Sequence, residues 1–84
     1  MLDSETVRLT PMQYRLLALL VKHAGVVVIR RILLIHLWGD MAETQTRMLD
    51  IHMRGLRKKL GAYADQYIET VIGVGYRFRP LPGS

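Results

Sequence analysis

The sequence predicts a small α+β domain in which helices are followed by a β-hairpin. Apolar side chains recur at helical spacing in three successive segments, and β-branched and aromatic residues alternate near the carboxyl end. A chain of 84 residues, of which 50% are hydrophobic, is long enough for one small core. We expect residues 1–79 to form this domain and residues 80–84 to be a tail, either a linker or a cloning scar.

The amino-terminal part predicts a short strand followed by a helix. Residues 1–9 end in alternating apolar and polar side chains, which favours a strand. Thr10 then suits a helix N-cap, and Gln13 stands where a capping box needs its amide. We expect the helix to end at a left-handed Gly25. The side expected to be buried comprises Tyr14, Leu16, Leu17, Leu20, Val21 and Ala24.

A second helix is predicted at residues 30–38. It follows residues 26–29, whose β-branched side chains favour a very short strand or an extended linker. Winding at 100° per residue points Leu33, Leu34, Leu37 and Trp38 inward and Ile32, Ile35 and His36 outward. With Ile29, the outward isoleucines would form an apolar patch that meets a neighbouring protomer or an amino-terminal part of the protein. The alternative is that this helix is rotated or packed more deeply.

The third helix, predicted at residues 47–60, carries most of the charge. Leu49, Met53, Leu56 and Leu60 follow the i, i+4, i+7, i+11 spacing of a buried face. The rest of its surface holds five cations and one acid, a net +4 in a chain whose formal charge is +5. Glycines bound this region, since Gly39 breaks the second helix before a loop at residues 40–45 and Gly61 stops the third.

The carboxyl-terminal part predicts a β-hairpin. A loop at residues 62–65 precedes alternating strand patterns at residues 67–71 and 76–78. Residues 73–75, Gly-Val-Gly, have the composition of the turn between them.

The composition excludes several functional classes. Without cysteine the chain has no disulfide, thiolate zinc site or cysteine nucleophile. His23, His36 and His52 lack metal-ligand spacing, and we expect one of them on the surface and two half-buried. No phosphate loop or acid–base pair of carboxylates is present, so we expect no catalytic site, metal, cofactor or small-molecule substrate. Residues 26–38 are too short and too charged to span a membrane, and we expect a cytoplasmic protein.

The charge distribution favours nucleic acid as the partner. One α-helix fits the major groove of DNA, where Arg and Lys contact phosphates and guanine. A hairpin that ends in Arg77 and Arg79 could reach the backbone or the minor groove. The alternative is that the cations only solvate the outer face of a bundle helix.

Five motifs stand in a specific order along the chain: Leu9-Thr10-Pro11, Leu37-Trp38-Gly39, Leu49-Asp50-Ile51-His52-Met53, Leu56-Arg57-Lys58-Lys59-Leu60 and Gly73-Val74-Gly75-Tyr76-Arg77-Phe78. In this order the chain resembles the DNA-binding effector domain of OmpR/PhoB-type response regulators. The resemblance implies a winged helix-turn-helix, with a three-helix core, a short N-terminal strand and a C-terminal β-hairpin wing.

The resemblance also implies a function and partners. It implies sequence-specific binding to double-stranded promoter DNA, with the third helix in the major groove and the wing near the minor groove. Transcription would be regulated as the output of a two-component system, whose phosphorylated receiver domain would precede this domain and drive homodimerisation on DNA. The loop after the second helix often meets RNA polymerase in such proteins, and here it contains Asp40, Met41, Ala42, Glu43 and Thr44.

The expected DNA-binding residues come from matched positions and from charge. Arg47, His52, Arg54 and Arg57 match family positions that contact phosphates or bases, Thr70 matches a hydroxyl at the wing base, and Trp38 offers its indole N–H to a phosphate. Lys58, Lys59 and Arg77 are added to the expected DNA-binding residues because of their positive charge. Met48 completes the set, with an apolar contact to a thymine methyl where a small hydroxyl residue is common.

Two further departures from the family pattern suggest a second function. Gly55 replaces a residue that is often long and polar, which removes a base contact and costs ~1 kcal/mol of helix propensity. Ile72 replaces the arginine that several members carry at the wing tip, which weakens minor-groove reading. The alternative function is therefore a winged-helix protein–protein interaction module with weakened DNA binding.

Overall fold

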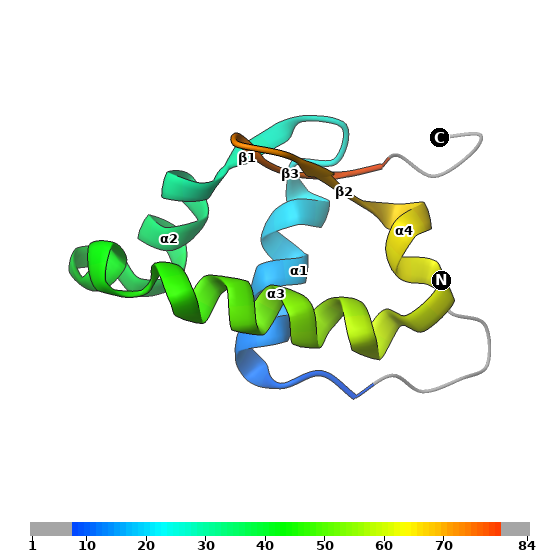
Figure 1. Ribbon diagram of the computed structural model, residues 1–84, viewed down its shortest axis with the longest axis horizontal. Coiled ribbons are helices and arrows are strands. Elements are labelled where there is room, and N and C mark those ends of the chain that lie inside the picture. Colours follow the sequence, from blue (N-terminus) through cyan, green and yellow to red (C-terminus); the bar gives the residue numbers. More distant parts are fainter. Residues whose placement is uncertain (1–7, 80–84) are drawn as a thin grey trace.

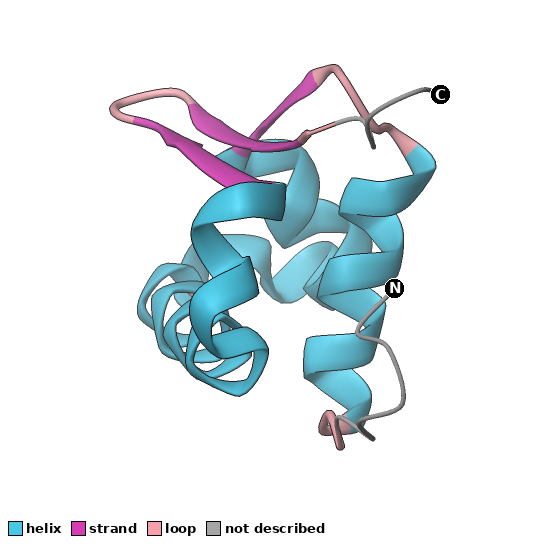
Figure 2. Ribbon diagram, turned by 90° about the vertical axis from the view of Figure 1, so that its right-hand side faces the viewer, coloured by secondary structure: helices cyan, strands magenta, loops and turns pink. Residues whose placement is uncertain are grey.

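A three-stranded antiparallel sheet lies over a group of helices in the computed structural model, which describes residues 8–79 (Figures 1 and 2). The strand order is β1-β3-β2. The elements are α1 (Pro11–Lys22), β1 (Val27–Ile29), α2 (Arg30–Trp38), the 3-10 helix η1 (Gly39–Thr44), α3 (Thr46–Leu60), the 3-10 helix η2 (Gly61–Tyr63), α4 (Ala64–Tyr67), β2 (Ile68–Val71) and β3 (Gly75–Phe78).

The capping box at the start of α1 is confirmed, but the expected end of the helix is wrong. The Thr10 hydroxyl accepts a hydrogen bond from the Gln13 N–H at 3.1 Å, and Gln13 Oε1 accepts one from the Thr10 N–H at 3.0 Å. The helix ends at Lys22, and Gly25, with φ of +88°, lies in the turn that follows. The strand predicted at residues 1–9 falls mostly outside the described residues, and residues 8–10 form no strand.

The buried side of α1 also differs from the expected one. Gln13, Leu16 and Leu20 are buried, whereas Tyr14, Val21 and Ala24 are exposed. The apolar residues of this helix extend around too much of its surface for periodicity to choose one side. Packing against α3 determines which side of α1 is buried, because the buried Gln13 faces Gly55 on that helix.

The short strand β1 is confirmed, and it completes the sheet by pairing with the hairpin. Val28 lies opposite Tyr76, and Ile29 lies opposite Gly75. Gly75 is therefore the first residue of β3 and not part of the turn, which comprises residues 72–74. A Cβ atom on Gly75 would lie 2.1 Å from the carbonyl oxygen of Val28, so close approach to β1 requires glycine there.

The predicted bounds and faces of α2 are confirmed. Leu33, Leu34 and Leu37 are buried, Trp38 is half-buried, and Ile29, Ile32 and Ile35 are exposed. Whether another surface covers the isoleucines stays a prediction.

Both predicted loops are instead helical. Residues 40–45 lie largely in η1, and residues 62–65 lie in η2 and α4. Two of these short helices each contribute one small buried side chain to the core, Ala42 from η1 and Ala64 from α4. A single alanine gives too little periodicity to distinguish a helical turn from a loop.

The core lies where α1, α2 and α3 meet the inner face of the sheet. The predicted face of α3 is confirmed, since Leu49, Met53, Leu56 and Leu60 are buried, and Gly61 ends the helix with φ of +59°. The other buried hydrophobic residues come from the neighbouring elements and include Leu16, Leu20, Leu33, Ile68 and Tyr76. Among residues 8–79, no helix has both the length and the apolar composition needed to cross a bilayer.

Candidate nucleic-acid interface

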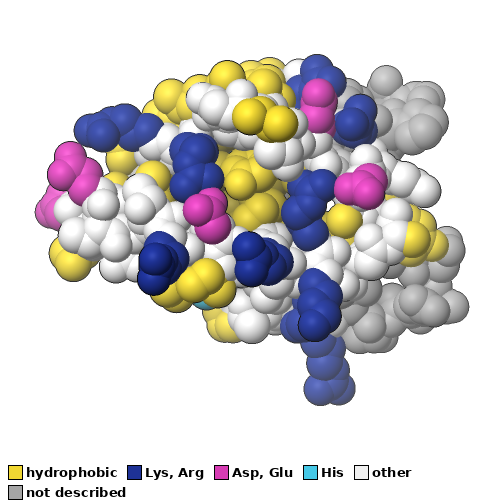
Figure 3. Space-filling view, viewed as in Figure 1, with side chains coloured by type: hydrophobic (Ala, Val, Ile, Leu, Met, Phe, Trp, Pro, Cys, Tyr) yellow, Lys and Arg dark blue, Asp and Glu magenta, His cyan; other side chains and the backbone are white. Residues whose placement is uncertain are grey.

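The face of α3 opposite the core presents a row of free cations. Arg47, Arg54 and Lys58 are spaced i, i+7 and i+11, which places them on one side of the helix, and all three are exposed. None forms a hydrogen bond or ion pair with another residue of the described part of the chain. Figure 3 shows Lys and Arg side chains in dark blue along α3 on this face of the molecule. Three unpaired charges in a row give this face a positive potential that attracts polyanions.

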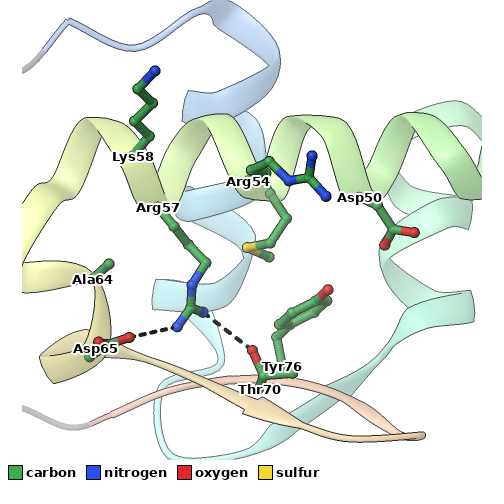
Figure 4. A pocket seen from close by; sticks show the side chains of 9 residues that line it. Asp50, Arg54, Arg57, Lys58, Ala64, Asp65, Thr70 and Tyr76 are labelled. Atoms are coloured by element: carbon green, nitrogen blue, oxygen red, sulfur yellow. Dashed lines mark hydrogen bonds and ion pairs between the residues drawn. The ribbon is translucent and has the colours of Figure 1, made fainter.

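A groove of about 560 Å³ lies between α3 and the hairpin (Figure 4). Arg57 crosses it from α3: Nη1 donates to the Thr70 hydroxyl at 3.3 Å, and Nη2 donates to Asp65 Oδ1 at 3.0 Å. The hairpin, α3 and α4 are thus joined by one guanidinium group. The remaining lining includes Asp50, Met53, Arg54, Lys58, Ala64 and Tyr76.

An ion pair fixes the first turns of α2 and α3 relative to each other. Arg30 Nη1 donates to Asp50 Oδ1 at 2.7 Å, and Nη2 donates to the Thr46 carbonyl oxygen at 3.4 Å. The hydrogen bond to Asp50 raises the pKa of the Arg30 guanidinium above its ordinary value, against the opposing effect of burial. The only acid of α3 is therefore neutralised within the protein, and the net charge of the helix surface stays positive.

Four other predicted DNA-binding residues lie on or beside the flank of α3 that faces away from the wing. The half-buried Trp38 packs against His52 with ring centroids 6.0 Å apart. Lys59 Nζ donates to the Arg8 carbonyl oxygen at 2.6 Å. Met48 lies on the same flank and is exposed.

Gly55 lies on the side of α3 that packs against α1, and its expected effect on base contact stays a prediction. A Cβ atom on Gly55 would lie 2.7 Å from Gln13 Nε2, so this position faces α1. Because Gln13 is buried and held by Thr10, the glycine allows α1 and α3 to approach closely.

The structure separates some predicted site residues from α3. Arg77 lies next to Tyr76 in β3 and therefore points to the outer face of the sheet, where its Nε donates to Glu69 Oε1 at 2.8 Å.

Of the predicted polymerase-contact residues, Asp40, Met41, Glu43 and Thr44 are exposed, but the Ala42 side chain is buried in the core. The histidine prediction is wrong in number, because His23 and His36 are exposed and only His52 is half-buried. Residues 8–79 contain no cluster of His, Cys, Asp and Glu suited to a metal.

Sequence reasoning missed two contributors to this surface. Ile51 is 49% exposed and lies between Arg47 and Arg54 on the outer face of α3. The helical period that identified the buried face could have placed it there. Asp65, the partner of Arg57, gave no such signal because its segment had the composition of a loop.

Comparison with known proteins places this arrangement in a family. The sequence matches the family described as "Transcriptional regulatory protein, C terminal" over residues 4–78. It is 43% identical over 74 residues to the response regulator ArlR of Staphylococcus aureus strains Mu50 / ATCC 700699 and MW2. Each alignment covers 87% of this chain and 34% of ArlR, so the chain spans about a third of the length of these curated relatives.

A solved structure has the same fold. The chain is similar to the C-terminal domain of the nisin resistance regulator NsrR, a lantibiotic response regulator, with a TM-score of 0.80 and 33% identity. The superposition covers 94% of this chain and 81% of that chain. The chain therefore belongs to the C-terminal effector domains of OmpR/PhoB-type response regulators, a family of winged-helix, DNA-binding transcription regulators.

Proposed function

We propose that this domain binds double-stranded promoter DNA sequence-specifically, with α3 in the major groove and the β2–β3 wing near the minor groove. The observation that carries the proposal is the row of Arg47, Arg54 and Lys58 on the exposed face of α3, free of partners among the described residues. A helix with one buried apolar side and one cationic side can enter the groove without losing its packing.

The groove between α3 and the hairpin supports phosphate contacts beside this row. Arg57 and Thr70 line it together and offer a charged donor and a hydroxyl. The indole of Trp38 and the imidazole of His52 would serve the opposite flank of α3, with Lys59 further along the helix. Contact between Arg77 and DNA stays a prediction, because this residue lies on the other face of the sheet.

Salt dependence tests the proposal directly. Fluorescence anisotropy with labelled duplexes, selected from a random pool, should give a log–log slope near −0.9 for each phosphate neutralised, and we expect ~4 to 6 phosphates. Lys58→Ala should weaken all duplexes alike and reduce the slope by about one phosphate equivalent.

Lys22→Ala is the matched control. Lys22 is also exposed, but it lines a separate groove between α1 and α2. The same loss of charge there should leave both affinity and slope close to those of the wild type. A salt-independent affinity, or no bound duplex even at low salt, would reject DNA binding.

Regulatory partners extend the proposal. We propose that the exposed residues of η1 contact RNA polymerase, that a receiver domain precedes this domain in the full regulator, and that two copies bind tandem half-sites. This function belongs in the cytoplasm, where promoter DNA and the polymerase are found.

The alternative is a protein–protein interaction module with weakened DNA binding. The exposed Ile29, Ile32 and Ile35 favour it, as does Ile72, which is 91% exposed in the turn of the wing and carries no charge for a phosphate. The salt titration separates the two functions, because only DNA binding depends on the release of phosphate counterions.

A further inference from the structure

The exposed surface of α3 carries hydrophobic side chains among its cations. Arg47 lies at the amino-terminal end and Arg54 and Lys58 lie in the carboxyl-terminal half, and two hydrophobic side chains are exposed between Arg47 and Arg54. These are Met48, 37% exposed, and Ile51, 49% exposed. In Figure 3, hydrophobic atoms lie among the dark blue basic groups along this helix. The core does not need either side chain, since the buried face of α3 is complete without them.

We propose that Met48 and Ile51 form one apolar strip that reads thymine methyl groups in the major groove. The inference rests on the proposed function and adds a base preference to it. The C5-methyl group of thymine is the apolar group that a major groove offers, and an aliphatic side chain recognises it by contact. The proposal thereby extends the contact expected for Met48 to Ile51, three residues further along the helix.

The position of the strip on α3 supports thymine methyl groups of DNA as its partner. Residues near the amino-terminal end of a recognition helix are those that reach base edges. Arg47 precedes Ile51 and Arg54 follows it on the outer face of α3, with Met48 on the adjoining flank, so a partner of the strip must also accept flanking cations. Phosphates on both sides of a groove meet this requirement, whereas an apolar protein surface would leave the cations desolvated without partners.

The spacing gives a further expectation about the site. Side chains at i and i+3 on a helix have Cβ atoms about 5–6 Å apart. Bases along one strand rise by about 3.4 Å per step. Met48 and Ile51 should therefore read thymines within two base steps of each other.

Replacing single thymines by deoxyuridine tests the strip, because the change removes one methyl group and keeps base pairing. The probe is the tightest duplex selected from the random pool. Loss of one buried methyl contact should weaken wild-type binding about fourfold at one or two thymines. Ile51→Ala should bind the unmodified duplex more weakly and should lose this sensitivity at one of those positions.

Lys58→Ala serves as the control variant. It should weaken binding while the sensitivity to deoxyuridine stays the same, because a phosphate contact carries no base information. Normal binding of every deoxyuridine duplex by the wild type would overturn the strip and leave DNA binding intact. Unchanged deoxyuridine sensitivity in both Ile51→Ala and Met48→Ala would equally overturn it. Failure to bind any duplex would instead reject the proposed function.

Discussion

Arg57 is the residue at which the fold and the proposed DNA surface meet. Its side chain is 27% exposed, and it joins α3 to Thr70 of the wing and Asp65 of α4. The carboxylate of Asp65 is 94% exposed, so water screens the pair and its contribution to stability is about 0–1 kcal/mol. The same carboxylate lies in the groove that a phosphate would enter, and there it competes for the guanidinium.

Asp65→Asn should therefore strengthen DNA binding with little effect on stability. Removing the competing charge should raise affinity about two- to fivefold, the range that corresponds to an exposed ion pair. The measurement is an anisotropy titration at about 0.15 M salt, where the Debye length of about 8 Å confines charge effects to near neighbours. Asp40→Asn is the control, because it makes the same charge change at an exposed residue of η1 that does not line the groove. Equal gains in the two variants would contradict a local competition at Arg57.

The sequence identified Arg57 and Thr70 but could not identify Asp65. The first two match positions of a family pattern, and each carries a side chain suited to phosphate. Asp65 acts only because α4 places it beside Arg57, eight residues away along the chain. The pairing of Asp65 with Arg57 therefore follows from the tertiary structure, and a segment with the composition of a loop gives no information about it.

At the scale of elements, the sheet depends on one glycine that the sequence pattern assigns to a turn. Gly75 starts β3 and lies between Ile29 of β1 and Val71 of β2. A side chain on Gly75 would meet the backbone of Val28, which cannot rotate away as a side chain can. The third strand of the sheet therefore depends on the absence of a Cβ atom.

Gly75→Ala should destabilise the domain by about 2–3 kcal/mol, because β1 must move away from β3. Urea denaturation followed by circular dichroism measures this cost. Gly73→Ala tests the ordinary cost of replacing a hairpin glycine, since Gly73 has φ of +78° but nothing within 4 Å of its Cβ position. That variant should lose only about 1–2 kcal/mol, from the left-handed conformation alone. A Gly75→Ala variant as stable as Gly73→Ala would contradict the close strand contact.

Elements with strong local signals were predictable, and their pairings were not. The capping box of α1 and the bounds of α2 follow from residues within one or two helical turns. That β1 pairs with β3 is a contact between Val28 and Tyr76, which are far apart in the sequence. The approach of α1 to α3 is likewise non-local, so the contact between Gly55 and Gln13 could not be predicted from the pattern of either helix.

At the scale of the whole molecule, α3 supplies both the core and the proposed DNA surface. Leu56 is fully buried on one side, while Arg54 and Lys58 are exposed on another. Stability and binding therefore depend on different faces of the same helix. Substitutions on the two faces should separate these properties as long as the helix keeps its position.

Leu56→Ala should lower the free energy of unfolding by about 2–5 kcal/mol, because it leaves a cavity at a fully buried position. A small domain has about 5–15 kcal/mol in total, so the variant should remain folded at low temperature. Under those conditions its DNA affinity should equal that of the wild type, whereas Lys58→Ala should keep the wild-type denaturation midpoint and bind more weakly. A folded Leu56→Ala variant that binds DNA ten times more weakly would show instead that core packing sets the position of α3 on DNA.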